Sequence, residues 1–252
     1  MAVSYNGDNS RKNDEGYVIN GLWYPRVTSI VNIKAKPALY RFYGELNSFA
    51  EGESIKNNSA AEGTLVHEAA EKILIGEPAD FDPKIKPSID ALREFVEKNN
   101  IHVDPEWVEK RIVHYKERYA GTIDALAIIG GKFGVLDLKT SVSIYRDYNI
   151  QTAAYFGSLI EEFPTLQTRW ILRVDQAQSC LKCGAKRRMK GGREKIRNNG
   201  QRDCEHEWGE MQGHIELKES PHWKTDYEAF LAAKRLWEWE NEPWLKRVGY
   251  LR

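Results

Sequence analysis

Apolar and polar residues follow two different periods along the chain. In the ranges 36–50, 57–76 and 86–100, apolar residues recur at three- and four-residue spacing, which is typical of amphipathic helices. The range 17–31 consists of two short apolar runs around an Asn-Gly pair, which predicts a hairpin leading into a helix. We therefore expect helices to dominate the first hundred residues.

The remainder of the chain mixes strands and helices. Short apolar runs predict strands, and a run of helical period that ends at Pro164 predicts a helix between them. This order of elements predicts an α/β fold, in which a mixed central β-sheet is flanked by helices. The expected strands cover 106–115, 119–129, 132–141, 168–179 and 211–220, and the expected helices cover 148–163 and 227–242.

The two central apolar runs, on either side of a Gly-Gly pair, each contain one aspartate. If the two glycines form the turn of a hairpin, Ile129 faces Lys132. The same register puts Asp124 directly opposite Asp137. Side chains in this arrangement lie about 5 Å apart, and two like charges there are destabilising unless a positive charge offsets them.

Lys139 supplies that positive charge, because strand alternation puts it on the same face as Asp137. Two carboxylates at this separation suit a hard divalent cation such as Mg²⁺. Such an ion lowers the pKa of a bound water, and the lysine could position the hydroxide or stabilise charge on the phosphorane. The set predicts phosphodiester hydrolysis. Metal-assisted hydrolysis of another ester needs the same parts, and solvated aspartates at a sheet edge are the alternative without chemistry.

Composition narrows the class of protein only a little. The chain has 252 residues, with 37 Lys and Arg against 37 Asp and Glu, so any nucleic-acid surface must be local. No apolar run approaches the roughly 20 residues that span a bilayer, and residues 1–16 contain no signal core. We expect a soluble cytoplasmic protein (in the host cytoplasm if viral), with a flexible tail over 1–16 and one domain over 17–252.

Three cysteines gather late in the chain. Cys180 and Cys183 form a C-x2-C pair that is followed by glycine, as in zinc ribbons, and Cys204 and His206 offer two more ligands. Four such ligands would close a structural zinc site, which could order an insert, 180–208, that is too polar to build its own core. Reduced cysteines in a flexible loop are the alternative. An iron–sulfur cluster held by four thiolates is not expected, because there is no fourth cysteine.

Positive charge is concentrated in the same insert. In a chain without net charge, such a cluster predicts a local phosphate-binding patch that would contact DNA; a solvated loop would have the same composition. The basic residues are Lys182, Lys186, Arg187, Arg188, Lys190, Arg193, Lys195, Arg197 and Arg202.

Four short motifs occur in a recognisable order. They are "GTLVHEAAE" at 63–71, "GTID" at 121–124, "LDLKTS" at 136–141 and "QTAAY" at 151–155. Together they resemble the PD-(D/E)XK nuclease superfamily, in particular its RecB-type branch, which includes CRISPR adaptation exonucleases, mitochondrial genome maintenance exonucleases and many phage enzymes. Ile123 stands where the family name has proline.

The resemblance implies a restriction-endonuclease-like core and a set of residue roles. Asp124 and Asp137 would hold Mg²⁺ or Mn²⁺, with His67 as a further ligand, and Lys139 would assist the attack of water. A surface or core histidine is the alternative for His67.

The resemblance also implies roles for residues on two helices. Gln151 and Tyr155, four residues apart on one helix face, would orient the lysine or contact the substrate. Ordinary packing of Tyr155 is the alternative. Glu71 shares a helix face with the histidine, although a solvated helix position suits it equally well. Glu109 could add a carboxylate to the metal site, although a surface position is the favoured interpretation for charges on that strand.

The expected function is that of a Mg²⁺- or Mn²⁺-dependent deoxyribonuclease, an exonuclease on single strands or DNA ends in replication, recombination or repair. A structure-specific endonuclease is one alternative. A catalytically silent DNA-binding or assembly module is another, and in a third the zinc ribbon docks a recombination or replication protein. No membrane partner is expected.

Overall fold

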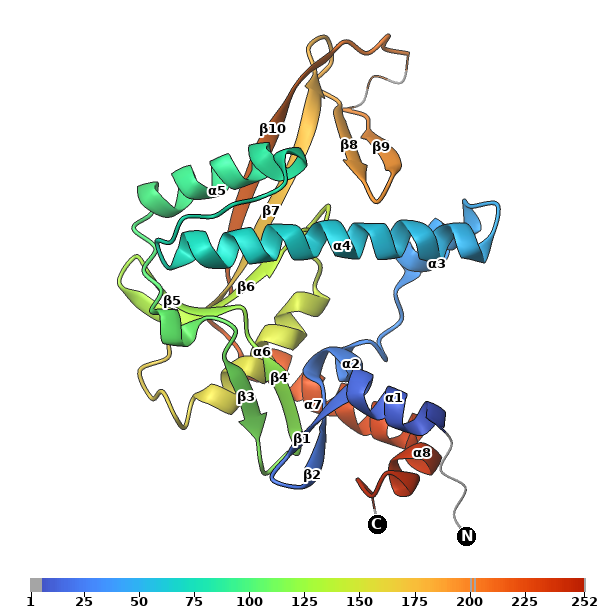
Figure 1. Cartoon of the computed structure of the whole chain (residues 1–252), viewed down its shortest axis with the longest axis vertical. Coiled ribbons are helices and arrows are strands. Elements are labelled where there is room, and N and C mark those ends of the chain that lie inside the picture. Colours follow the sequence, from blue (N-terminus) through green and yellow to red (C-terminus); the bar gives the residue numbers. More distant parts are fainter. Residues whose placement is uncertain (1–5, 200, 202, 252) are drawn as a thin grey trace.

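A six-stranded mixed sheet forms the centre of the computed structural model, which describes residues 6–199, 201 and 203–251 (Figure 1). β5 and β6 form an antiparallel hairpin, β6 runs parallel to β7, and β10 pairs antiparallel with the other edge of β7. β8 pairs with the last part of β7, so β6 and β8 follow one another along one edge of that long strand. The strands are β5 (Ala125–Ile129), β6 (Lys132–Lys139), β7 (Thr168–Cys180), β8 (Lys186–Lys190), β9 (Arg193–Arg197) and β10 (Trp208–Glu219).

Helices cover both faces of the sheet. The long helix α4 and helix α5 lie over one face, whereas α6 and α7 lie over the other (Figure 1). Two short antiparallel pairs, β1–β2 and β3–β4, lie beside α2 and α6. Their bounds are β1 (Gly16–Ile19), β2 (Leu22–Pro25), β3 (Arg111–His114) and β4 (Tyr119–Thr122). The helices are α1 (Asn6–Glu15), α2 (Val27–Val31), α3 (Pro37–Gly44), α4 (Phe49–Leu74), η1 (Pro83–Ile85), α5 (Lys86–Lys98), η2 (Pro105–Trp107), α6 (Asp147–Leu159), α7 (Lys224–Glu240) and α8 (Glu242–Arg247).

The core divides into two clusters because side chains alternate across the sheet. Leu126 and Val135 are buried among the side chains of α2, α6 and α7. Leu136 and Leu138, one position away in the alternation, are buried with the apolar side of α4 and α5. A strand that is covered on both faces reads as a continuous apolar run, which is the pattern of the central strands. The predicted mixed α/β fold, with a central sheet between helices, is confirmed.

The hairpin register predicted from the Gly-Gly pair is confirmed. Ile129 pairs with Lys132, and the register continues without a shift to Ala125 opposite Leu136. The predicted strand over 119–129 is split, however. Its first part, β4, pairs with β3, and the chain then changes sheet at Ile123 and Asp124 before β5 begins. The first aspartate therefore lies at a break between two strands, where its side chain is not confined to the pleat of either.

Helix α4 begins eight residues before the predicted start, at Phe49. Ser48 is its N-cap, because the Ser48 hydroxyl accepts the N–H of Glu51, and the Glu51 carboxylate accepts the N–H of Asn47. This reciprocal arrangement is close to a capping box, which the Ser-x-x-Glu spacing would have indicated. The predicted helix over 36–50 accordingly ends at Gly44, as α3.

Residues 6–15 form helix α1 where the sequence predicts a flexible tail over 1–16; residues 1–5 lie outside the described part. The indole N–H of Trp23 donates to the Lys12 carbonyl at 2.9 Å, and Arg11 donates to Asn241 near the other end of the chain. These contacts hold α1 against β2 and against the junction of α7 and α8. In the described ranges, no helix combines the length and the apolar character needed to cross a bilayer.

Buried Arg169, on β7, holds the start of α6 in place. Its guanidinium donates to the Asn149 carbonyl at 2.7 Å and to the Asp226 carboxylate at 2.7 Å, which joins β7 to α6 and α7. A buried guanidinium is stable only when paired in this way. The helix that carries Gln151 is therefore fixed relative to β6.

Candidate active site and metal cluster

The two predicted aspartates come together where β6 approaches its end. Asp137 is 1% exposed, and the Asp124 carboxylate accepts the backbone N–H of Leu138 at 2.6 Å. That bond places the Asp124 carboxylate against β6, at the residue that follows Asp137. The two carboxylates thus share one desolvated site at the end of β6.

Lys139 offsets their charge. Its ammonium group forms an ion pair with Asp137 and lies 5.0 Å from the centre of the Tyr148 ring. Burial lowers the pKa of Lys139, but the Asp137 and Asp124 carboxylates more than offset this, so the net shift of the pKa is upward. Lys139 is therefore a cation at neutral pH.

Burial is the main influence on the two acids. It raises the pKa of Asp124 and that of Asp137 to about 6 each, and the lysine only partly opposes the shift. The Asp124 charge raises the pKa of Asp137 further. Among the described residues, the buried Oδ2 atom of Asp137 has the Lys139 ammonium beside it but receives no well-directed hydrogen bond. A carboxylate in this state gains from a divalent cation.

These shifts predict a pH-dependent stability. The folded pKa, about 6, is above the unfolded value of 3.8, so the folded state binds more protons in between. The contribution of this carboxyl group to stability is greatest below pH 3.8 and is lost as the pH rises through 6. We expect Asp137→Asn, measured by urea unfolding in EDTA, to remove this loss and to be about 2–3 kcal/mol more stable than wild type above pH 6.5. Equal free energies of unfolding for Asp137→Asn and wild type at every pH would contradict this prediction. The control is Asp90→Asn, which replaces a partly exposed acid.

His67, on α4, lies beside the two acids. Its Nδ1 atom lies 3.9 Å from Asp124 Oδ1. Burial lowers the pKa of His67, and the nearby Lys139 lowers it further. The imidazole is thus neutral at physiological pH, which is the form that binds a metal.

Glu71 and Glu109, left open by the sequence, lie next to each other on the His67 side of the site. They line one cavity of about 600 Å³ together with His67. Burial raises the pKa of both groups; next in order, the Asp124 charge raises that of Glu71, and the Glu71 charge raises that of Glu109. The Glu109 N–H also donates to the Asp124 carbonyl at 3.0 Å. Both carboxylates therefore belong to the surroundings of the acid pair.

Gln151 connects α6 to the acids. Its amide N–H group donates to Asp137 Oδ1 at 3.3 Å and to the Tyr155 hydroxyl at 2.9 Å. Tyr155 is 3% exposed, and burial raises its pKa well above 10. Gln151 is thus held by the tyrosine and in turn orients the carboxylate of Asp137.

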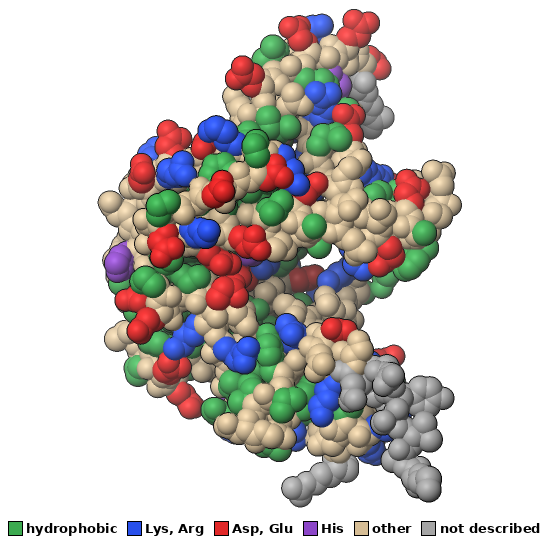
Figure 2. Space-filling view, in the orientation of Figure 1, with side chains coloured by type: hydrophobic (Ala, Val, Ile, Leu, Met, Phe, Trp, Pro, Cys, Tyr) green, Lys and Arg blue, Asp and Glu red, His purple; other side chains and the backbone are tan. Residues whose placement is uncertain are grey.

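Lys139, which forms an ion pair with buried Asp137, borders an open cavity of about 370 Å³. His67, Lys139 and Tyr148 line one side of it, and Arg188 and Lys190 from β8 line the other. Figure 2 shows the molecule hollowed between α4 and the helices below it, with acidic and basic side chains on the inner wall. The sequence did not indicate that the insert reaches this cavity.

The predicted basic patch is a β-hairpin, β8–β9, that folds back onto α4. Gly191 at its turn donates its N–H to Glu62, and its backbone lies so close to Ile55 and Ser59 that a side chain would not fit. Arg188 and Lys190 both donate to the Thr140 carbonyl, at 2.7 and 2.6 Å, directly after Lys139. The remaining predicted DNA-binding residues lie on the same hairpin: Lys186 is exposed, Arg187 donates to Gln178, and Arg193 donates to Glu45. Arg202 lies outside the described residues.

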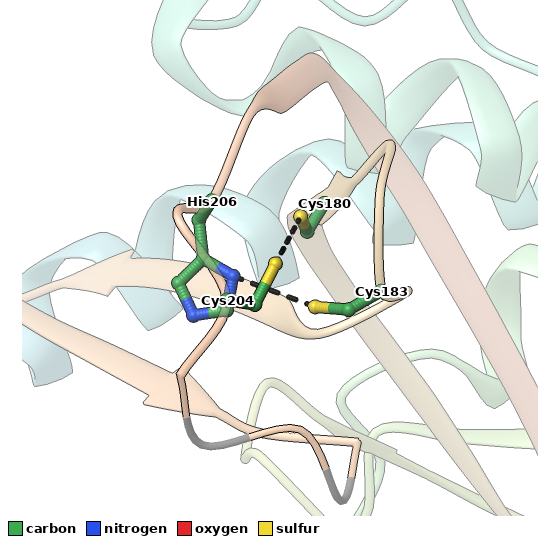
Figure 3. A group of neighbouring side chains, drawn as sticks. All are labelled: Cys180, Cys183, Cys204 and His206. Atoms are coloured by element: carbon green, nitrogen blue, oxygen red, sulfur yellow. Dashed lines mark hydrogen bonds between the residues drawn. The ribbon is translucent and has the colours of Figure 1, made fainter.

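The three cysteines and the histidine of the insert converge at the tip of the β7–β10 ribbon (Figure 3). Their ligand atoms all lie within 4.8 Å of one another, with Cys180 Sγ 3.9 Å from Cys204 Sγ and Cys183 Sγ 3.4 Å from His206 Nδ1. Three sulfurs and one imidazole nitrogen form the Cys₃His set of structural zinc sites. The group could hold zinc.

The backbone around Cys180 and Cys183 prepares these sulfurs for a metal. The Gly184 N–H donates to the Cys180 carbonyl at 2.9 Å, and the Ala185 N–H points at Cys183 Sγ, 3.4 Å away. Burial raises the pKa of Cys180, but the Cys183 N–H and then the His206 ring lower it to about 5 overall. The lowered pKa of Cys180 favours its thiolate, the form that binds a cation.

Comparison with known proteins does not identify the function of this site. No family model matches the sequence, and no curated protein matches it either. The crystal structure of a protein named "putative exonuclease", from Eubacterium rectale, is similar at a TM-score of 0.42 with 11% sequence identity, over 100% of this chain and 88% of that one. A likeness of this degree identifies neither a family nor an activity, so the functional argument rests on the site.

Proposed function

We propose that this chain is a metal-dependent DNA nuclease of the PD-(D/E)XK superfamily, of the RecB type. The observation that carries the proposal is the convergence of Asp124, Asp137, Lys139 and Gln151, from the break before β5, from β6 and from α6, on one buried and charged site. Burying two carboxylates and an ammonium group carries a large desolvation penalty, which a fold accepts where the charged groups serve a function. Charges of this kind at the wall of an open cavity are typical of an active site.

Mg²⁺ or Mn²⁺ fits the donor set of this site. Asp124 and Asp137 would hold the ion with oxygen atoms, and His67 with its neutral imidazole. When bound, the ion supplies a water of lowered pKa and neutralises charge on a phosphate oxygen.

Side chains of this site would orient the acids and stabilise the charge that develops on the phosphate. Gln151 fixes the rotamer of Asp137 through its amide, and Tyr155 fixes Gln151. The Lys139 ammonium, held by Asp137 and the ring of Tyr148, stabilises the negative charge that grows on the phosphoryl oxygens as water attacks. The phosphorus–oxygen ester bond then breaks, which leaves an alcohol on one product and a phosphate monoester on the other.

The substrate and the action are inferred from the charges and from the resemblance. The basic hairpin at the cavity favours a polyanion, and the family resemblance favours an exonuclease on DNA single strands or ends, in replication, recombination or repair. The Cys₃His group would hold a structural zinc ion that orders the insert. Endonuclease action on branched DNA, and a DNA-binding module without catalysis, are the rival functions.

The test is cleavage of labelled nucleic acid. Single- and double-stranded DNA, labelled at either end, and single-stranded RNA are incubated with the purified chain in Mg²⁺, Mn²⁺, Ca²⁺ or EDTA. We expect DNA to be degraded from an end in Mg²⁺ or Mn²⁺ and to remain intact in EDTA. Internal cuts only would favour the endonuclease. Binding without cutting in every metal would overturn the nuclease and leave the binding module.

A further inference from the structure

A second cavity, enriched in positive charge, lies beneath the β8–β9 hairpin. It has a volume of about 110 Å³ and lies between the hairpin, β7, β10 and the loop after β6. Five basic side chains and one carboxylate line it, so its charge is strongly positive. The basic residues are Arg173, Lys186, Arg188, Lys195 and Arg197.

The single carboxylate, Asp175, is already engaged twice. It accepts from Arg188 at 2.6 Å and from Arg173 at 3.1 Å. Within the described part of the chain, Lys186 and Lys195 have no acidic partner, and Arg197 donates only to the Ser143 hydroxyl, at 3.3 Å. These three side chains are exposed and solvated, and no described acidic side chain pairs with them, so an anion in the cavity would be attracted by all three.

A buried polar atom also lacks a partner at this cavity. His214, directly opposite Asp175 in the β10–β7 pair, lines it, and the Nε2 atom of His214 is buried without a hydrogen bond among the described residues. A buried nitrogen without a hydrogen-bond partner destabilises the fold. A ligand oxygen in the cavity could accept its hydrogen bond, in the tautomer that carries the proton on Nε2.

The cavity adjoins the proposed catalytic site. Arg188 lines both this cavity and the one that contains Lys139 and His67. Lys195 lines both this cavity and a third one, of about 570 Å³, that reaches Tyr148 and Gln151. A strand that lies along the catalytic cavity therefore passes the positive charges under the hairpin.

We propose that the cavity beneath the hairpin binds one backbone phosphate of the nucleic-acid strand, next to the phosphodiester that is cut. The proposal rests on the proposed nuclease function and extends it to a second contact. Its small volume and its charge suit a compact anion rather than a base. The Cys₃His group brackets the hairpin in the sequence, with Cys183 before it and Cys204 after it, so the cavity depends on a folded insert.

Binding measured without cleavage tests this directly. The variant Lys195→Gln/Arg197→Gln is compared with wild type in Ca²⁺, using a labelled single-stranded oligonucleotide over a range of salt concentrations. We expect roughly tenfold weaker binding, and a slope of log Kd against log salt that is smaller by about 0.7, the value for one lost phosphate contact on a single strand. The double variant Lys98→Gln/Lys218→Gln, exposed elsewhere, has the same change in net charge and is expected to bind like wild type.

A scan of neutral linkages distinguishes the source of the phosphate. Methylphosphonate replaces one phosphate at a time along the oligonucleotide. We expect one position where the replacement weakens binding to wild type but not to Lys195→Gln/Arg197→Gln. Absence of such a position, or equal behaviour of the two double variants, would overturn the proposal. If the wild type binds inorganic phosphate but the scan shows no sensitive position, the cavity is a site for free phosphate. That result would also overturn the proposed contact with a backbone phosphate.

The outcome is separable from that of the proposed function. A sensitive position in the scan without cleavage in any metal would refute the nuclease but keep the phosphate contact. Cleavage with no sensitive position would keep the nuclease and refute the contact. Where cleavage occurs, the hairpin variant is expected to raise KM roughly tenfold and to leave kcat within a factor of about two.

Discussion

We expect the replacement of Asp137 by asparagine to lower kcat for the proposed cleavage by on the order of 10³-fold or more and to leave the protein folded. The amide side chain would keep the shape of the carboxylate and its contact with Gln151. It would remove the charge that pairs with Lys139 and that would hold the cation. Because the aspartate is buried with a raised pKa, its neutral replacement does not destabilise the fold at neutral pH.

The measurement is the single-turnover rate on the preferred labelled substrate, with thermal unfolding as the check on folding. Wild type is expected to gain thermal stability from Mn²⁺, and Asp137→Asn to gain none. Asp90→Asn, at a partly exposed position of α5, is the matched control and should cleave like wild type. Full activity of Asp137→Asn would refute the assignment of the site.

We expect the replacement of Cys183 by serine to prevent zinc binding and to loosen the insert. Wild type is expected to carry about one zinc ion per chain, because the four ligand atoms already lie within 4.8 Å of one another. Between the ribbon and the hairpin there are few buried apolar side chains, so a bound metal would be the main source of order at the tip. If zinc contributes even about 3 kcal/mol to the closed insert, its loss raises the open population roughly 100-fold.

Elemental analysis and limited proteolysis measure the two effects. Cleavage within 184–203 should become much faster in Cys183→Ser, while the rest of the chain resists protease, because the two core clusters lie away from the tip. Lys182→Ser, between two of the ligands, is the control and should keep its zinc. Zinc-free wild-type protein, or a variant as resistant as wild type, would show that the cluster has no structural metal.

Part of this site could be read directly from local sequence. The Gly-Gly turn and the two-residue period of a strand predict that Asp124 faces Asp137 and that Lys139 shares the face of Asp137. The observed register extends to Ala125 opposite Leu136, one pair short of the two acids, and Lys139 forms an ion pair with Asp137. In the same way, helical spacing brings Gln151 and Tyr155 into contact. Each of these relations spans few residues or a single tight turn.

The relations that the sequence left undetermined depend on long loops and on packing. His67 is far from Asp124 in the sequence, and the approach of α4 to the sheet brings them within reach. The raised pKa of the two acids requires burial on both faces, which no local pattern reports. The same holds for the hairpin, which reaches Thr140 and α4 only because β8 continues the edge of β7 where β6 ends.

The sequence by itself determined which side chains could act and which of them are neighbours across one turn, because strand and helix periods fix those distances whatever the rest of the chain does. Only the tertiary structure decided that the acids are desolvated, that a helix from the first third of the chain reaches them, and that the basic insert lies at their cavity. Those properties arise when two core clusters close around the sheet, and closure depends on the whole chain.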